Sequence, residues 1–123
     1  MLLDSGITTM KENEFVMAID QGTTSSRTIL FDHQYSIKSM SQIDLTQYFP
    51  YSGWVEHSPE EIWKSTIKTA KKAMRINNIA ANQVASVGIS NQRETTILWD
   101  KNTGKPIYNA IVWQDVAIYS DIP

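Results

Sequence analysis

Residues 15–32 read FVMAIDQGTTSSRTILFD, two apolar runs on either side of a polar turn. Short apolar runs of this kind are typical of strands, and a glycine-containing turn between them predicts a β-hairpin. The first run, residues 15–19, is continuously apolar, which favours a strand buried on both faces. This hairpin is the starting point for the fold class, which is completed by the strands and the helix predicted after it.

The next strong signal is the start of a helix at residues 58–61, which read SPEE. Ser58 is a suitable N-cap, Pro59 fits the first helical position, and Glu61 would complete a capping box. Apolar residues then recur at helical spacing, and the helix should end at Asn77 and Asn78. The predicted apolar stripe consists of Trp63, Ile67, Ala70 and Met74.

Further strands are predicted on both sides of this helix. One lies within residues 37–45, a buried one spans residues 84–89, and β-branched and aromatic residues favour another at 95–99. Residues 100–106 form a turn cluster, and residues 107–113 pair back or begin a new strand. Strands mixed with a helix predict an α/β fold with a mixed sheet.

Length and composition narrow the class of protein. The chain has 123 residues, about one domain, with 13 acidic and 11 basic side chains and a net charge of −2, which gives no electrostatic footprint for nucleic acid. It contains no cysteine, and its two histidines, His33 and His57, are too few for a histidine-based zinc site without carboxylate ligands. We expect a cytoplasmic protein without a membrane span.

The polar turn at residues 20–27 is the first candidate site. Gly22 allows a tight turn whose backbone N–H groups favour an anion, and the hydroxyl side chains and Arg27 add donors for phosphate oxygens. Asp20, at the end of the first strand, is placed to hold Mg²⁺ through water. An ordinary hairpin turn explains the same residues equally well. Neither a P-loop nor a dinucleotide fingerprint is present.

The second candidate site follows the predicted strand at residues 84–89. Arg93 and Glu94 offer donors and acceptors side by side, which suits a neutral polyol, and ligands of α/β sheets bind beyond the carboxyl ends of strands. A solvated charged turn is the alternative. Trp113 suits the wall of such a pocket, or the core. His57 is interpreted as a structural polar residue. Three further tryptophans are assigned to packing, namely Trp54, Trp63 and Trp99.

Three long segments together resemble the N-terminal part of the FGGY family of carbohydrate kinases. They are AIDQGTTSSRTILFD (18–32), SGWVEHSPEEIW (52–63) and VGISNQRETTILWDKNTGKPIYNAIVWQD (87–115). The Arg-Glu pair within NQRETT favours the members that phosphorylate glycerol over those that act on xylulose, ribulose or gluconate. The resemblance covers residues 15–115, preceded by a tail at 1–14 and followed by a non-matching end at 116–123.

The resemblance also implies roles for individual residues. Asp20 corresponds to the acidic residue near the Mg²⁺ of MgATP, and Arg93 and Glu94 to the pair that holds the glycerol hydroxyls. Trp113 corresponds to the aromatic wall of that pocket. The nucleotide side is implied to consist of Thr23, Thr24, Ser25 and Arg27.

The implied fold is the actin-like ATPase, or ribonuclease H-like, fold, present here as a partial N-terminal domain. The implied reaction transfers the γ-phosphoryl group of ATP to a glycerol hydroxyl, giving sn-glycerol 3-phosphate. The family's general-base aspartate lies beyond residue 123, so we expect the isolated chain to be inactive. There are three alternatives. The chain could be a non-catalytic remnant, or a carbohydrate-binding module. It could also be a complementing subunit of a split kinase, which pairs with its remainder or self-associates.

Overall fold

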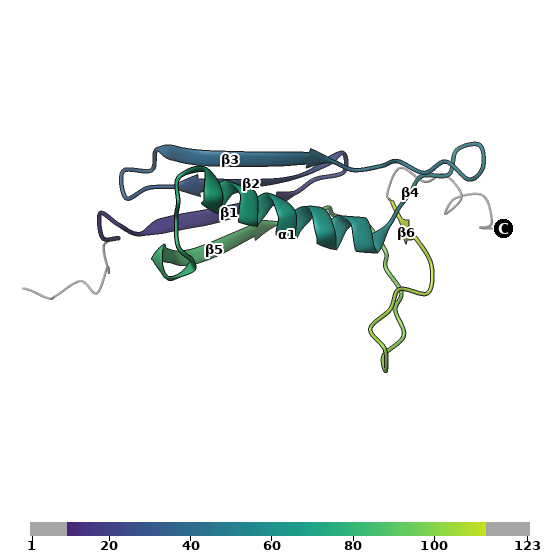
Figure 1. The fold of residues 1–123 in the computed structure, drawn as a ribbon. Helices are drawn as coiled ribbons and strands as arrows, with labels where there is room; N and C mark the ends of the chain where they lie inside the picture. Colours follow the sequence, from purple (N-terminus) through teal and green to yellow (C-terminus); the bar gives the residue numbers. More distant parts are fainter. Residues whose placement is uncertain (1–9, 113–123) are drawn as a thin grey trace, which may run out of the picture.

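The computed structural model describes residues 10–112 of the chain. Eight elements follow one another along the sequence (Figure 1). They are β1 (Phe15–Gln21), β2 (Ser25–Phe31), β3 (Ile37–Asp44), β4 (Glu56–His57), α1 (Pro59–Ile76), the short 3₁₀ helix η1 (Ala81–Gln83), β5 (Val84–Ser90) and β6 (Ala110–Ile111).

A four-stranded mixed sheet in the order β3-β2-β1-β5 forms the main layer. The predicted hairpin is confirmed, since β1 and β2 pair antiparallel with Asp20 opposite Arg27, and β3 extends the sheet antiparallel to β2. After the crossover through α1, β5 pairs parallel to β1, with Asp20 opposite Ser90. The C-terminal ends of the two parallel strands therefore lie side by side, and ligands of such sheets bind beyond these strand ends.

Helix α1 begins and ends where the sequence predicts. Ser58 is the N-cap, and its side-chain oxygen accepts a hydrogen bond of 3.3 Å from the Glu61 N–H. The predicted capping box is only half formed, because Glu61 Oε1 instead accepts 2.9 Å hydrogen bonds from the backbone N–H and the hydroxyl of Thr46. The Glu61 carboxylate thus ties the helix start to the segment that follows β3.

The helix lies across one face of the sheet (Figure 1) and packs on it through hydroxyl groups as well as apolar side chains. Ser26 Oγ and Ser65 Oγ lie 2.7 Å apart, and Thr28 Oγ1 and Thr69 Oγ1 lie 2.9 Å apart. These four residues are buried. Because such side chains are small, the helix approaches the sheet closely, and each of these four hydroxyls has a partner, as burial requires. The adjoining apolar core contains Met17, Leu30, Ala73 and Ile79.

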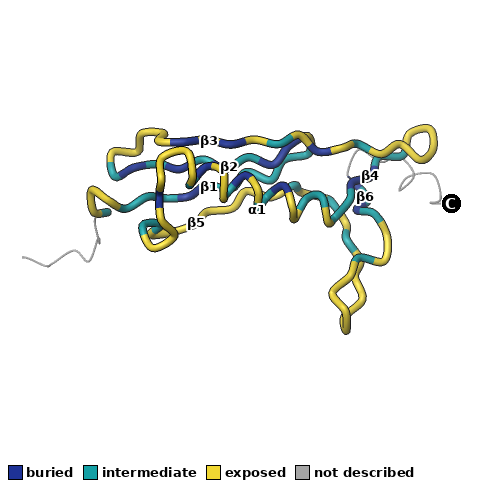
Figure 2. Tube along the Cα trace, viewed as in Figure 1, coloured by how far each residue is buried: buried dark blue, intermediate teal, exposed yellow. Residues whose placement is uncertain are grey.

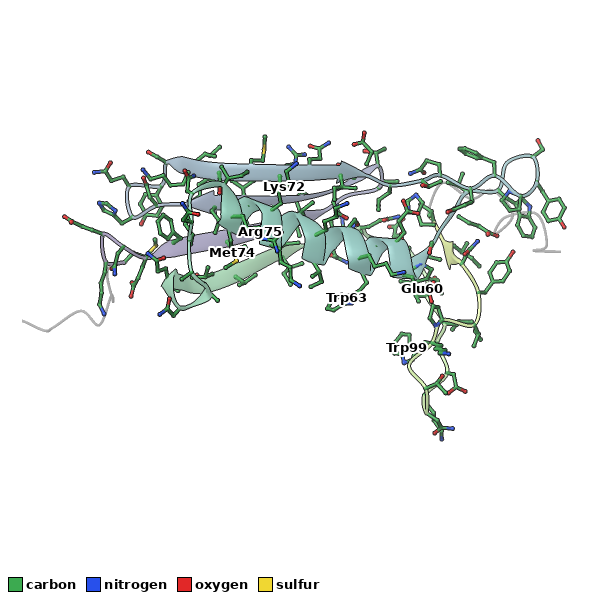
Figure 3. All side chains as sticks on the ribbon, in the orientation of Figure 1. Glu60, Trp63, Lys72, Met74, Arg75 and Trp99 are labelled. Atoms are coloured by element: carbon green, nitrogen blue, oxygen red, sulfur yellow. The ribbon has the colours of Figure 1, made fainter. Side chains whose placement is uncertain are left out.

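The predicted helical stripe is partly wrong. Ala70 and Met74 pack against the core, but Trp63 is 66% exposed. The residues of α1 that are buried are Ser65, Thr69 and Ala73. The buried face of α1 therefore differs from the predicted apolar stripe and consists of small residues, because these fit the close contact with the strands of the sheet. The assignment of Trp99 to packing is also wrong, since that side chain is 63% exposed. Figure 3 shows Trp63 and Trp99 on the same side of the molecule.

The prediction that residues 84–89 form a buried strand is correct in type and wrong in burial. Strand β5 is exposed along nearly its whole length, with Val87 53% and Ile89 71% exposed (Figure 2). It is one of the two edge strands of the sheet, and α1 contacts mainly β2 and β3. Apolar surface that the strand pattern reserves for burial is thus open to solvent among residues 10–112.

The region after β5 departs from the predicted strands at 95–99 and 107–113. Residues 95–99 contain only isolated bridges, Thr96 to Ile111 and Trp99 to Pro106, and the later strand shrinks to β6. Strand β6 pairs antiparallel with β4, with His57 opposite Ala110. The chain here is held by single bridges around the turn at 100–106 rather than by a continuous ladder. None of the described helices is long and apolar enough to cross a membrane.

Candidate functional site

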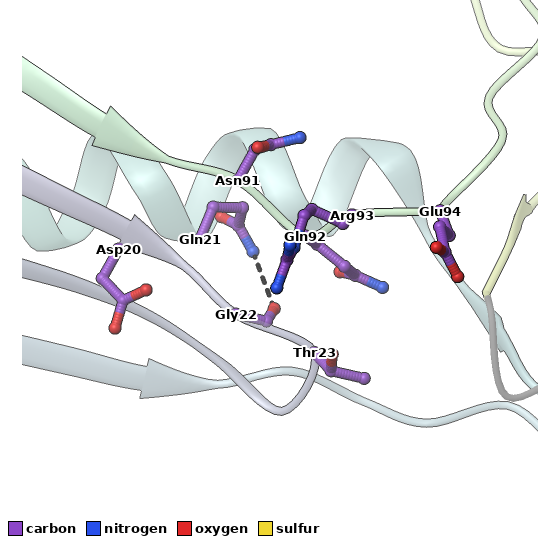
Figure 4. A pocket seen from close by; sticks show the side chains of 8 residues that line it. All are labelled: Asp20, Gln21, Gly22, Thr23, Asn91, Gln92, Arg93 and Glu94. Atoms are coloured by element: carbon purple, nitrogen blue, oxygen red, sulfur yellow. Dashed lines mark hydrogen bonds between the residues drawn. The ribbon is translucent and has the colours of Figure 1, made fainter.

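A pocket of about 400 Å³ lies at the shared edge where β1 and β5 end (Figure 4). Its two sides come from chain segments far apart in the sequence, each directly following or ending a strand. One side is the end and turn of the first hairpin, and the other is the segment after β5. The lining residues are Asp20, Gln21, Gly22, Thr23, Asn91, Gln92, Arg93 and Glu94.

The hairpin side is a tight, hydrogen-bonded turn. The Gly22 N–H donates to the Ser25 carbonyl at 3.0 Å, and a Cβ at Gly22 would stand only 3.3 Å from that same oxygen. Glycine is therefore favoured here by close packing of the turn on itself. The Gln21 side chain accepts 2.7 Å hydrogen bonds from Ser26 and Thr66, so the end of β1 is anchored to β2 and α1.

Two of the predicted phosphate-side residues line the pocket, and three do not. Asp20 and Thr23 contribute to it, whereas Thr24, Ser25 and Arg27 lie outside its lining. Arg27 Nη2 instead lies 3.3 Å from Asp20 Oδ2 across the β1–β2 pair, and both side chains are partly exposed. The arginine therefore neutralises the carboxylate on the sheet face next to the pocket.

The opposite side carries the charged pair of the pocket. Arg93 and Glu94 are both exposed, and neither side chain has a hydrogen-bond or ion-pair partner within residues 10–112. Glu94 has a φ of 54°, in the left-handed region that is costly for a residue with a Cβ. The turn thus presents a guanidinium and a carboxylate that are both available to a ligand. The backbone of Glu94 adopts a conformation that is unfavourable for a residue with a Cβ.

Behind the pocket, three side chains join its two sides. Gln47 Nε2 donates to the Thr23 carbonyl at 3.1 Å, and Gln47 Oε1 lies 2.8 Å from His57 Nε2. His57 Nδ1 lies 3.2 Å from Gln92 Nε2. His57 is only 1% exposed, so burial lowers the pKa of its imidazole, although the Glu61 carboxylate acts in the opposite direction.

The residues that fit a metal ion are few. Within residues 10–112, no group of three or more histidine, aspartate or glutamate side chains converges. Asp20 offers one partly exposed carboxylate at the pocket, which suits a contact to a hydrated Mg²⁺ and not a complete ligand set. Trp113, predicted as an aromatic wall, lies outside the described residues.

Four residues that line or support the pocket were given no individual role by the sequence, although three of them lie within or beside the candidate segments. Asn91 and Gln92 follow β5 directly, and their place after a strand was a usable signal. Gln21 lines the hairpin side for the same reason. Gln47, which holds the hairpin turn from behind, had no local signal, because it comes from an irregular segment.

The fold is that of the actin-like ATPases and their sugar-kinase relatives, present as part of a domain with a mixed sheet. The N-terminal domain model of the FGGY family of carbohydrate kinases matches residues 15–120. The chain belongs to this family, as its resemblance predicted.

Close curated relatives are glycerol kinases of bacteria. The glycerol kinase of Rhizobium meliloti is 55% identical over 101 residues, and that of Shewanella woodyi is 57% identical over the same length. In both cases the match covers 82% of this chain and 20% of the relative. The chain therefore spans about a fifth of the length of the curated relatives it matches.

Solved structures of kinases from this family are also similar to the chain. The crystal structure of Plasmodium falciparum glycerol kinase with ADP has a TM-score of 0.73 and 34% identity, covering 87% of this chain and 23% of that one. A xylulose-type kinase from Brucella ovis has a TM-score of 0.79 at 20% identity, covering 86% of this chain and 22% of that one. The second likeness shows the fold alone.

Proposed function

We propose that this chain provides part of the nucleotide-phosphate site and part of the glycerol site of an ATP-dependent glycerol kinase. One observation carries the proposal. The parallel strands β1 and β5 end at one edge, so the glycine-containing hairpin turn and the Arg93–Glu94 turn face the same pocket. The glycerol kinases among its relatives support the choice of polyol.

On the glycerol side, the proposal assigns the polyol to Arg93 and Glu94. The guanidinium donates hydrogen bonds only, and the carboxylate accepts them only, so the pair complements hydroxyls that do both. Their lack of side-chain partners within residues 10–112 leaves all these groups available. Trp113 is proposed as an apolar wall for the carbon side of the ligand.

On the nucleotide side, the proposal assigns phosphate oxygens to the hairpin turn, with Thr23, Thr24, Ser25 and Arg27 as donors. Asp20 fits an outer contact to the Mg²⁺ of MgATP, which would supply positive charge to the phosphates when bound. The role of this chain is then to position the phosphates and the glycerol next to each other, because phosphoryl transfer depends mostly on positioning and charge neutralisation.

We propose further that the 123 residues alone do not transfer the phosphoryl group. A base is needed to take the hydroxyl proton, and we infer from the family resemblance that this aspartate belongs to a part of the kinase beyond residue 123. The matched relatives are about five times as long as the matched segment, which accommodates such a residue elsewhere. The tail at 1–14, the partial domain at 15–115, the end at 116–123 and a cytoplasmic location stay predictions.

A second candidate function is that of a subunit that pairs with a complementing kinase segment or with itself. The observation that favours it is the exposed apolar surface of β5 at the open edge of the sheet, with Val87 and Ile89 both more than half exposed. An unpaired strand edge next to apolar side chains favours association.

The experiment that tests the main proposal is a pair of titrations of the ¹⁵N-labelled chain, with glycerol and separately with MgADP. We expect glycerol to shift the amide signals of residues 91–94 and MgADP to shift those of residues 21–25. Arg93→Ala should abolish the glycerol shifts and preserve those from MgADP. Lys101→Ala, which removes an exposed cation outside the pocket, is the matched control. Glycerol shifts that survive Arg93→Ala would contradict the assignment.

A further inference from the structure

The orientation of Gln47 places a proton on Nε2 of His57. Gln47 Nε2 lies 3.1 Å from the Thr23 carbonyl and 3.4 Å from the Leu45 carbonyl, and backbone carbonyls only accept hydrogen bonds. The amide nitrogen of Gln47 must therefore point at them, which turns Gln47 Oε1 toward the imidazole. At 2.8 Å from that oxygen, His57 Nε2 must carry a proton and donate it.

Burial favours the neutral imidazole, which leaves the other ring nitrogen, Nδ1, without a proton. A neutral imidazole with a proton on Nε2 has an acceptor at Nδ1, and Gln92 Nε2 at 3.2 Å supplies the donor. The Thr23 carbonyl, Gln47, His57 and Gln92 thus form one directional series of hydrogen bonds. In this arrangement Gln92 Oε1 is buried and has no hydrogen-bond partner within residues 10–112.

The series is anchored in a buried part of the molecule. His57 is 1% exposed and stands opposite Ala110 in the β4–β6 pair, where Ala110 is fully buried. Its two partners belong to the two sides of the pocket, since Gln47 holds the hairpin turn and Gln92 lines the opposite segment. A change at the imidazole therefore reaches both sides at once.

We propose that neutral His57 is a positioning residue of this pocket. Through Gln47 it fixes the Thr23 turn, and through Gln92 it fixes the segment that presents Arg93 and Glu94. Its consequence for glycerol binding rests on the proposed function, whereas the hydrogen-bond series and its protonation state do not.

Protonation should break the series at one defined point. Once Nδ1 carries a proton it can no longer accept from Gln92 Nε2, and the Gln92 amide must rotate to present its unpartnered Oε1. The charged groups nearby act differently. Glu61 of α1 favours the charged imidazole, while Glu56 of β4 accepts hydrogen bonds from Tyr108 and Asn109. Arg93 and Glu94, which follow Gln92, are exposed.

The test uses the full chain and nitrogen-detected NMR of its histidines. At pH 7.5 we expect the signature of an imidazole protonated only at Nε2 for His57. On acidification, the Thr23 backbone amide and the Gln92 side-chain amide should shift with one common midpoint below pH 6.5, the ordinary value for histidine. The variant His33→Gln, which removes the other histidine, is the control and should leave both of these shifts unchanged. A proton on Nδ1 at pH 7.5, or separate midpoints, would overturn the proposal.

Two variants separate positioning from bulk packing. His57→Gln can still provide one donor and one acceptor, whereas His57→Phe keeps a ring without either. We expect the phenylalanine variant to weaken glycerol binding about tenfold, and the glutamine variant to recover most of this loss and to remove the common pH midpoint. Equal glycerol affinity in the wild type and the phenylalanine variant would contradict the positioning role. If the wild-type chain shows the common midpoint but binds no glycerol, the proposed function fails and the positioning role stands.

Discussion

Thr28 of β2 and Thr69 of α1 share a hydrogen bond of 2.9 Å between their hydroxyl groups, and both residues are fully buried. Ser26 and Ser65 repeat the arrangement one turn earlier along the helix. The helix that covers the sheet is therefore attached by specific polar pairs, which favour one register of the helix on the strands.

This pairing predicts a non-additive effect on stability. Thr69→Val should lower the free energy of unfolding by about 1–3 kcal/mol, because it leaves the Thr28 hydroxyl buried without its partner. The double variant Thr28→Val with Thr69→Val should be less destabilised than the sum of the single variants. Urea unfolding of the four proteins measures this. Strict additivity would show that the two hydroxyls do not act as a pair.

A second prediction concerns the backbone of Glu94, whose φ is 54°. Glu94→Gly should be about 1 kcal/mol more stable than Glu94→Ala, because glycine adopts the left-handed region without steric cost. Both variants should lose glycerol binding equally, since both lack the carboxylate. The matched pair at Lys101, which is not among the positive-φ residues, should show the reverse order of stability. An alanine variant at 94 as stable as the glycine variant would exclude strain at this turn.

The lowered pKa of His57 predicts how stability depends on pH. Burial favours the neutral imidazole in the folded chain, so between the folded pKa and the unfolded value of about 6.5 the unfolded state binds more protons. The contribution of His57 is present above pH 6.5 and is lost as pH falls toward the folded pKa. Urea unfolding at pH 7.5, 6.5 and 5.5 should therefore show the wild type losing stability relative to His57→Gln. A constant difference between the two proteins would refute this linkage.

The exposed apolar side chains of the edge strand β5 predict that copies of the chain associate with one another. Ile89→Lys should reduce the concentration-dependent mass measured by sedimentation velocity, because it places a charge on the apolar surface of β5. Ile76→Lys is the control, since Ile76 is 51% exposed and belongs to the end of α1 rather than to β5. A wild-type chain that stays monomeric at every concentration would remove the case for a pairing surface.

The parts of the fold that the sequence predicts are those with local causes. The β1–β2 hairpin follows from two apolar runs around a turn, and α1 follows from Ser58 and Pro59 at its start. The burial of β5 could not be predicted in the same way. Its apolar pattern indicates a strand suited to burial, but its exposure depends on what covers it, and α1 lies over β2 and β3.

In the candidate site, too, the residues that could be predicted are those with local causes. Asp20, Thr23, Arg93 and Glu94 stand next to strand ends, so their type and place indicate a pocket. The hydrogen-bond series behind the pocket has no local signal, because Gln47, His57 and Gln92 are 10 and 35 residues apart and meet only after folding. Glu61 shows the same effect, since its carboxylate binds Thr46 in place of the cap expected from its neighbours.

The central claim is that the pocket between the hairpin turn and the Arg93–Glu94 turn holds the polyol and the phosphates of a glycerol kinase. The direct measurement is glycerol kinase activity of a chimera in which residues 15–112 replace the matching segment of the Rhizobium meliloti enzyme. We predict activity in the chimera and a loss of kcat/KM for glycerol of about 100-fold, or ~2.7 kcal/mol, in its Glu94→Gln variant. Glu60→Gln, which changes an exposed carboxylate in the first turn of α1, should leave kcat/KM unchanged. A folded chimera without activity, or one indifferent to Glu94→Gln, would contradict the claim.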